Sequence, residues 1–103
     1  MKSMTSNCIK EIADKILAYL SALPDGTESC TSDAFLQIDS KNSFTEAGFA
    51  INGEVIDNCD LFEIDYAVRK NANKYGIILD SSNYDGMVIG LPYNIGYIVK
   101  RRK

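Results

Sequence analysis

Five polar side chains recur along the segment from Asp60 to Gly76, DLFEIDYAVRKNANKYG, and their chemistry suits contact with nucleic acid. They are Tyr66, Arg69, Lys70, Asn73 and Lys74. Arginine and asparagine can form paired hydrogen bonds with guanine and adenine edges, whereas lysine and tyrosine contact phosphates. A solvated helix face has the same composition, so the pattern leaves both interpretations open.

Basic residues also gather at the C-terminal end, where the chain reads KRRK. Lys100, Arg101 and Arg102 are therefore further candidates for contact with phosphate or with an acidic protein surface. A run of charge at the end of a chain can equally serve solubility alone. The tail widens the candidate nucleic-acid interface without identifying its target.

Tyrosines form a second candidate surface, because this residue is enriched at protein interfaces. Tyr97 alternates with Ile95 and Val99, a period of two that predicts a position in the core. Tyr84 and Tyr93 have no such pattern. These two residues remain candidates for binding a protein partner.

The residue types give little support for catalysis. The chain has no histidine, so a cysteine or serine nucleophile would need another base. Cys8, Cys30 and Cys59 lie far apart and form no CxxC spacing of the kind that binds metal or performs redox chemistry. Glycine-rich nucleotide-binding motifs are absent from the sequence. We therefore expect a non-enzymatic protein with neither cofactor nor metal.

Length and composition predict one domain, with residues 1–103 forming a single unit that ends in the basic tail 100–103. The chain has 103 residues, of which 46% are hydrophobic and 24% charged. No apolar run approaches the roughly 20 residues that cross a bilayer, and the N-terminal segment lacks the apolar region of a secretory signal. A cytoplasmic protein that does not bind membranes is the simplest expectation.

The net charge of −3 is unevenly distributed along the chain. Residues 1–59 contain 4 basic and 9 acidic side chains, whereas residues 60–103 contain 7 basic and 5 acidic ones. The C-terminal part can therefore meet phosphate while the acidic N-terminal part limits nonspecific attachment to polyanions.

The polar segment is predicted to be a helix, because apolar residues recur on its other side at three- and four-residue spacing. These are Leu61, Ile64, Val68, Ala72 and Tyr75. Asp60 suits the N-terminal cap, with Glu63 in the capping-box position. Gly76 suits a left-handed residue that ends the helix.

The N-terminal part is predicted to contain a helix, a short edge strand and a second helix. The first helix begins near Thr5 or Ser6 and continues to about Ala22, where the turn residues LPDG end it. Its apolar stripe consists of Ile9, Ile12, Ala13, Ile16, Leu17 and Leu20. Residues 27–31 follow as the strand, and Thr31 or Ser32 caps the short second helix.

Two interpretations compete for residues 39–59. The sequence SFTE at 43–46 resembles a capping box, which favours a small helix over residues 44–50. Alternatively, residues 48–51 and 54–56 pair as a hairpin across Asn52-Gly53, a dipeptide suited to a type I′ turn. We favour the small helix followed by a tight turn.

The C-terminal residues are predicted to form antiparallel strands. Residues 77–80 and 87–90 are apolar runs separated by SSNYDG, whose Asn, Asp and Gly favour a chain reversal, so they are predicted to pair as a hairpin. Pro92 interrupts regular pairing because it lacks an N–H donor. Residues 95–100 then resume as a third strand.

This order of elements resembles the winged helix-turn-helix superfamily. The residues that carry the resemblance are DLFEIDYAVRKNANKYG as a recognition-like helix and IILD-SSNYDG-MVIG as a wing-like hairpin, with IKEIADKILAYL completing the core. The resemblance implies a small α+β domain of three or four helices with a C-terminal β-hairpin or three-stranded antiparallel sheet.

It also implies a DNA-binding or transcription-associated protein whose helix of residues 60–76 enters the major groove of duplex DNA. The alternative is a protein-interaction module on the same fold, an adaptor or inhibitor that uses its acidic half or its tyrosines.

Overall fold

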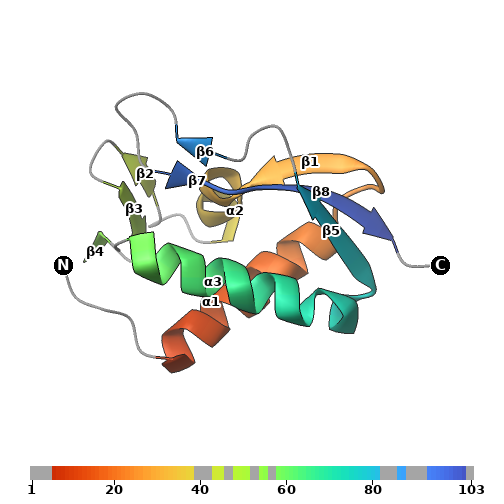
Figure 1. Ribbon diagram of the computed structural model, residues 1–103, viewed down its shortest axis with the longest axis horizontal. Coiled ribbons are helices and arrows are strands. Elements are labelled where there is room, and N and C mark those ends of the chain that lie inside the picture. The colour runs from red at the N-terminus through yellow and green to blue at the C-terminus, as the bar shows by residue number, and fades with distance from the viewer. Residues whose placement is uncertain are drawn as a thin grey trace.

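Two long helices and a three-stranded antiparallel sheet form the body of the protein, which belongs to the α+β class (Figure 1). The structure, a computed structural model, describes residues 6–38, 43–45, 48–51, 54–55, 58–81, 86–87 and 93–101. The long helices are α1 (Ser6–Ser21) and α3 (Asn58–Asn71). Two long helices therefore form the helical part of the body, whereas three or four helices were predicted. The intervening helix, α2 (Thr31–Ile38), has only 8 residues.

Helix α1 follows from the apolar stripe predicted for it. All six residues of the stripe are buried, and Ile16, Leu17 and Leu20 have no exposed surface. The helix ends before Pro24, and Gly26 adopts a φ of 84° in the turn. The Gly26 N–H donates to the Val99 carbonyl at 2.7 Å, which fixes this turn beside the sheet.

Helix α3 begins two residues before the predicted cap. Asp60 therefore lies buried within its first turn and is not the N-cap residue. After Asn71 the chain tightens into the 3-10 turn η1 (Ala72–Tyr75), and Gly76 ends it with a φ of 72°. Its N–H bonds to the carbonyls of Ala72 and Asn73. The left-handed glycine end predicted for this helix is confirmed.

The main sheet has the order β1-β8-β5, with all neighbours antiparallel. Its strands are β1 (Thr27–Cys30), β5 (Ile77–Ser81) and β8 (Gly96–Arg101). The predicted edge strand at 27–31 and the predicted third strand at 95–100 are confirmed, but the third strand is the central one. It lies between β1 and β5, and its side chains Tyr97 and Val99 are buried in the core on one face of the sheet.

The predicted hairpin between residues 77–80 and 87–90 is wrong. Strand β5 pairs with β8, with Leu79 opposite Val99. The short strand β6 (Gly86–Met87) pairs instead with β7 (Tyr93–Asn94) in a separate two-stranded sheet. Residues 88–90 lie outside the described part of the chain. Strand β8 brings the buried side chains Tyr97 and Val99 beside β5, where they join the same core as Ile77.

The segment between α2 and α3 contains strands where a small helix was favoured. They are β2 (Ser43–Thr45), β3 (Gly48–Ile51) and β4 (Glu54–Val55), in the order β2-β3-β4. The favoured helix is therefore wrong, and the alternative pairing on either side of Asn52-Gly53 is confirmed by Ala50 opposite Val55. A two-turn helix interrupted by Gly48 has little intrinsic stability, whereas paired strands satisfy more of the backbone.

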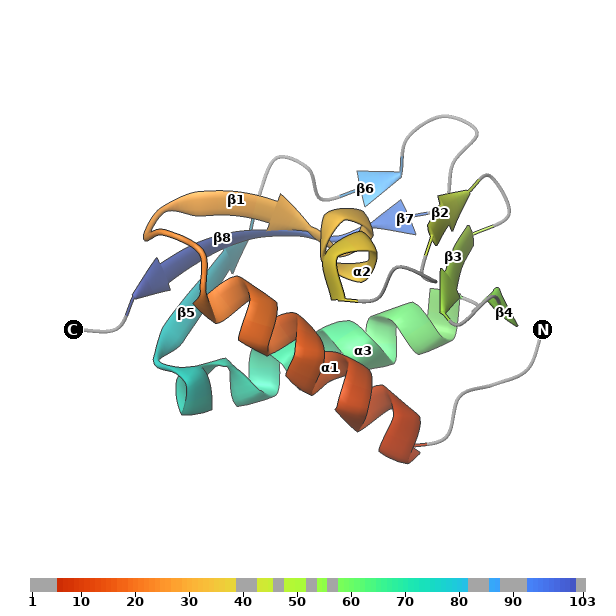
Figure 2. The same cartoon turned by 180° about the vertical axis from the view of Figure 1, so that it is seen from behind.

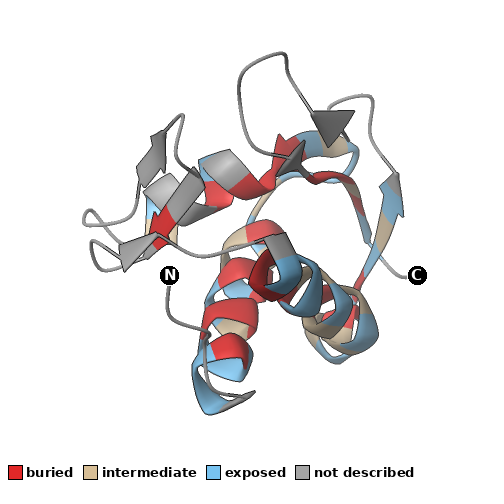
Figure 3. Ribbon diagram, turned by 60° about the vertical axis from the view of Figure 1, so that its left-hand side comes forward, coloured by how far each residue is buried: buried red, intermediate tan, exposed pale blue. Residues whose placement is uncertain are grey.

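The hydrophobic core lies where α1 and α3 pack against each other and against one face of the main sheet (Figure 2). Figure 3 shows that the buried residues of the two helices face inward, while their outer faces are exposed. The core includes Leu61, Ile64 and Val68 of α3 together with Ile77, Tyr97 and Val99 of the sheet. Among the described residues, no helix is both long and apolar enough to cross a bilayer.

Candidate nucleic-acid interface

The five candidate residues on α3 and η1 divide into an exposed group and one half-buried residue. Tyr66 has 68% of its surface exposed, and Lys70, Asn73 and Lys74 are exposed as well. They lie 4, 7 and 8 positions after Tyr66, so they share one side of the helical segment. Arg69 differs, because only 34% of its side chain is accessible.

Arg69 is held by two contacts inside the protein. Its Nε donates to both carboxylate oxygens of Asp65, at 3.0 and 3.2 Å, and the pair has the i, i+4 spacing of a helix. Its guanidinium carbon lies 5.1 Å from the centre of the Tyr97 ring, within the range of a cation–π interaction. These contacts aim Arg69 toward β8 and use one of its hydrogen-bonding edges.

Tyr97 completes this arrangement from the central strand. Its ring is buried, and its hydroxyl donates to Asp65 Oδ1 at 2.8 Å. We call Asp65, Arg69 and Tyr97 the Asp65 clamp. The Asp65 carboxylate therefore accepts from a residue on its own helix and from a residue 32 positions further along the chain, which fixes α3 against β8.

Tyr97 lies in the core, as its alternation with Ile95 and Val99 predicted, but its role in the Asp65 clamp was not predicted. The spacing of Asp65 and Arg69 was a visible signal, because opposite charges four positions apart on a helix commonly pair. The contact with Tyr97 had no local signal. Arg69 thus helps to position α3. Only the N–H groups of its two terminal nitrogens can still bind a ligand.

Lys70 lies beside Tyr66 on the exposed side of α3. Its ammonium nitrogen is 5.9 Å from the centre of the Tyr66 ring, within the range of a cation–π interaction. Phe62, one turn before Tyr66, is 49% exposed. The exposed side of α3 is therefore aromatic toward its N-terminal end and basic toward its C-terminal end.

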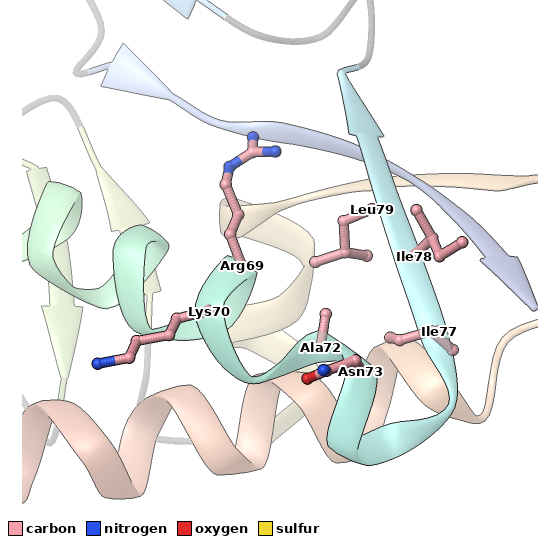
Figure 4. A pocket seen from close by; sticks show the side chains of 7 residues that line it. All are labelled: Arg69, Lys70, Ala72, Asn73, Ile77, Ile78 and Leu79. Atoms are coloured by element: carbon pink, nitrogen blue, oxygen red, sulfur yellow. The ribbon is translucent and has the colours of Figure 1, made fainter. Parts of the chain in front are cut away.

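A hollow of about 330 Å³ separates the second half of α3 from strand β5 (Figure 4). Its lining consists of Arg69, Lys70, Ala72, Asn73, Ile77, Ile78 and Leu79. In Figure 4 the Arg69 guanidinium points toward β8, while the Lys70 ammonium points away from β5. Among the described residues, the lining thus combines two basic side chains and one amide with apolar residues, and the Arg69 guanidinium is already engaged by Asp65.

The described residues of the basic tail have partners of their own. Lys100 Nζ lies 3.3 Å from Asp80 Oδ2 on the exposed surface. The Arg101 N–H donates to Asp25 Oδ1 at 2.6 Å, and its Nη2 donates to the Leu23 carbonyl at 2.7 Å. The structure therefore ties Arg101 to the turn after α1 and does not direct it toward α3. Arg102 lies outside the described residues.

The tyrosines proposed for a protein partner are only partly within the described structure. Tyr93 belongs to β7, opposite Met87, but its side chain is not among those described. Tyr84 lies outside the described residues. Within the described part of the chain, no three Cys, His, Asp or Glu side chains are grouped as they would be to hold a metal ion.

Comparison of the chain with family models, with curated proteins and with solved structures finds no match in any of the three. The geometry of α3 and its surroundings is therefore the basis for inferring a function.

Proposed function

We propose that the protein is a small winged-helix-like domain that binds duplex DNA through the exposed side of α3 and η1, without catalysing a reaction. The observation that carries the proposal is the common orientation of Tyr66, Lys70, Asn73 and Lys74 on that side. A helix of this diameter fits the major groove, which is about 12 Å wide. In this arrangement Lys70 and Lys74 contact phosphates and Asn73 contacts a base edge.

The order and pairing of elements support the winged-helix resemblance. A helix, a strand and a second helix precede α3, and two antiparallel strands of the same sheet follow it. Because the predicted hairpin is wrong, the wing-like pair is β5 with β8, and the residues between them include the small β6–β7 pair.

The Asp65 clamp changes the expected role of Arg69 in DNA binding. Since its Nε is bonded to Asp65, Arg69 cannot use that edge on a guanine. Its contribution is to hold α3 at a fixed angle to the sheet, while Lys70 and Lys74 supply the charge. Glu63 is also exposed, one turn before Tyr66, so the basic surface is confined to the C-terminal half of the helix.

The test is binding of a mixed-sequence DNA duplex, measured by fluorescence anisotropy over a series of salt concentrations. Two phosphate contacts predict that the logarithm of the binding constant falls with the logarithm of salt concentration with a slope of about −2. The variant Lys70→Ala/Lys74→Ala should bind more weakly, and its slope should be smaller by about 2.

The matched control is Lys10→Ala/Lys15→Ala, which removes the same charge from exposed positions on α1. It should keep the salt dependence of the wild-type protein. Equal losses in the two double variants would show that net charge alone drives binding. Binding by the wild type that does not respond to salt would contradict the proposal.

A protein partner is the second candidate function, and the exposed aromatic residues favour it. Phe62 and Tyr66 are large, four positions apart and 49% and 68% exposed, which is the pattern of an anchor for a hydrophobic groove. Nuclease-treated co-purification should then recover a partner with the wild type but not with Phe62→Ser/Tyr66→Ser. Recovery by both proteins would exclude this surface.

A further inference from the structure

Helix α3 exposes two large aromatic side chains on its outer side. Tyr66 is 68% exposed, and Phe62, one turn earlier, is 49% exposed. In the described part of the chain, Ile78 of β5 is the only other large hydrophobic residue that is exposed. The proposed DNA contacts do not involve Phe62. Two neighbouring aromatic side chains on the outside of a helix are typical of a protein interface.

A glutamate and a lysine lie along the same side of α3, with Tyr66 between them. Glu63 and Lys70 are both exposed, and because they are seven positions apart they differ by only about 20° around the helix axis. Glu63 comes three residues before Tyr66 and Lys70 four residues after it, so they lie about 4.5 and 6 Å from it along the axis. This side of α3 is therefore acidic before Tyr66 and basic after it.

Such a surface is complementary to a second copy of itself when the two helices run antiparallel. A two-fold axis next to Tyr66 places Glu63 of each chain opposite Lys70 of the other, and it brings the two Tyr66 rings together at the centre. A parallel arrangement would instead place the two Lys70 side chains against each other, so the charges favour the antiparallel one. Packed helix axes lie about 8–10 Å apart, a separation at which these side chains meet.

We propose that the chain forms a homodimer in which two α3 helices pack antiparallel, with Phe62 and Tyr66 at the centre and a Glu63–Lys70 ion pair on either side. The Lys70 ammonium lies 5.9 Å from the centre of the Tyr66 ring of its own chain, which places its charge at the edge of this aromatic centre. Tyr66 and Lys70 also belong to the proposed DNA surface, so the dimer and bound DNA exclude each other. That consequence rests on the proposed function, whereas the dimer does not.

The test measures self-association of the full chain by sedimentation equilibrium in the absence of DNA. One pair of helices of this length buries less than the roughly 1,200 Å² of a stable interface, so we expect a dissociation constant between about 10 μM and 1 mM. Dilution of the ¹⁵N-labelled protein should shift the amide signals of residues 62–70 more than those of α1. These shifts would locate the interface on α3.

Charge reversal tests the antiparallel arrangement. Glu63→Lys and Lys70→Glu should each weaken self-association at least about tenfold, because either change turns both ion pairs into repulsive contacts. An equimolar mixture of the two variants should dimerise again, since a chain with lysine at both positions then faces a chain with glutamate at both. The double variant Glu63→Lys/Lys70→Glu should regain the affinity of the wild type. Circular dichroism would establish that each variant is folded.

The matched controls are Glu11→Lys and Lys15→Glu, which make the same changes in net charge at exposed positions on α1. Each control should self-associate like the wild type, and mixing the two should add nothing. Three results would overturn the proposal: a wild-type monomer at millimolar concentration, no recovery in the mixture or the double variant, and equal losses in the α1 controls. Because no DNA is present, a failure of DNA binding would leave the dimer unaffected, and a monomer that binds DNA would overturn the dimer alone.

Discussion

Replacing Tyr97 with phenylalanine tests whether the Asp65 clamp stabilises the fold. The substitution removes one buried oxygen and leaves the ring beneath Arg69 in place. The lost bond is a hydroxyl donating to a carboxylate at 2.8 Å, and hydrogen bonds to charged groups contribute about 1.5–3 kcal/mol. Asp65 keeps its contact with Arg69 and is 19% exposed, which places the expected loss near 1.5–2 kcal/mol.

For a domain of this size, such a loss lowers the midpoint of thermal unfolding by about 6–12 °C. Urea and thermal unfolding followed by circular dichroism would measure both quantities. The matched control is Tyr66→Phe, because Tyr66 lies on the same helix with 68% of its surface exposed. The control should change the free energy of unfolding by no more than about 0.5 kcal/mol.

A double-mutant cycle with Asp65→Asn separates the Tyr97 hydroxyl from general effects of each substitution. If the hydroxyl acts through Asp65, the loss from Tyr97→Phe should shrink when Asp65 is already asparagine. Losses that simply add would refute the Asp65 clamp as a coupled unit. A loss for Tyr97→Phe no larger than that for Tyr66→Phe would refute its contribution to stability altogether.

Two backbone features give further predictions, both measurable by urea unfolding. Gly76→Ala should cost about 1–2 kcal/mol, since its φ of 72° strains any residue with a Cβ while the space around it is open; a loss below about 0.5 kcal/mol would contradict this. Thr31→Val should cost about 1–3 kcal/mol, because the buried Thr31 hydroxyl accepts the Ile95 N–H at 3.2 Å; an unchanged stability would show that this N–H finds another acceptor.

The local sequence patterns were sufficient to predict the elements that build the core. The stripes of α1 and α3 place every third or fourth residue inside, and residues such as Leu17 and Ile64 are fully buried as expected. The glycine that ends η1 was equally predictable, because few residues adopt a positive φ. These features depend on interactions within a few residues, which the sequence displays directly.

Strand pairing was less predictable, because it depends on partners that are distant in the chain. The partners of β8 come from residues 27–30 on one side and 77–81 on the other. The turn-like sequence after residue 80 suggested the nearest apolar run as the partner of β5, but β5 pairs with β8. The SFTE sequence misled in a similar way, since a capping box does not compensate for a helix too short to be stable.

The candidate site shows the same division between local and distant information. Exposure of Tyr66, Lys70, Asn73 and Lys74 follows from their positions opposite the apolar stripe. The orientation of Arg69 depends on Tyr97, which reaches it from the central strand, and the hollow depends on where β5 lies relative to α3. The sequence could therefore identify the polar face of the helix. It could not show that Arg69 positions the helix while the other four residues are exposed for binding.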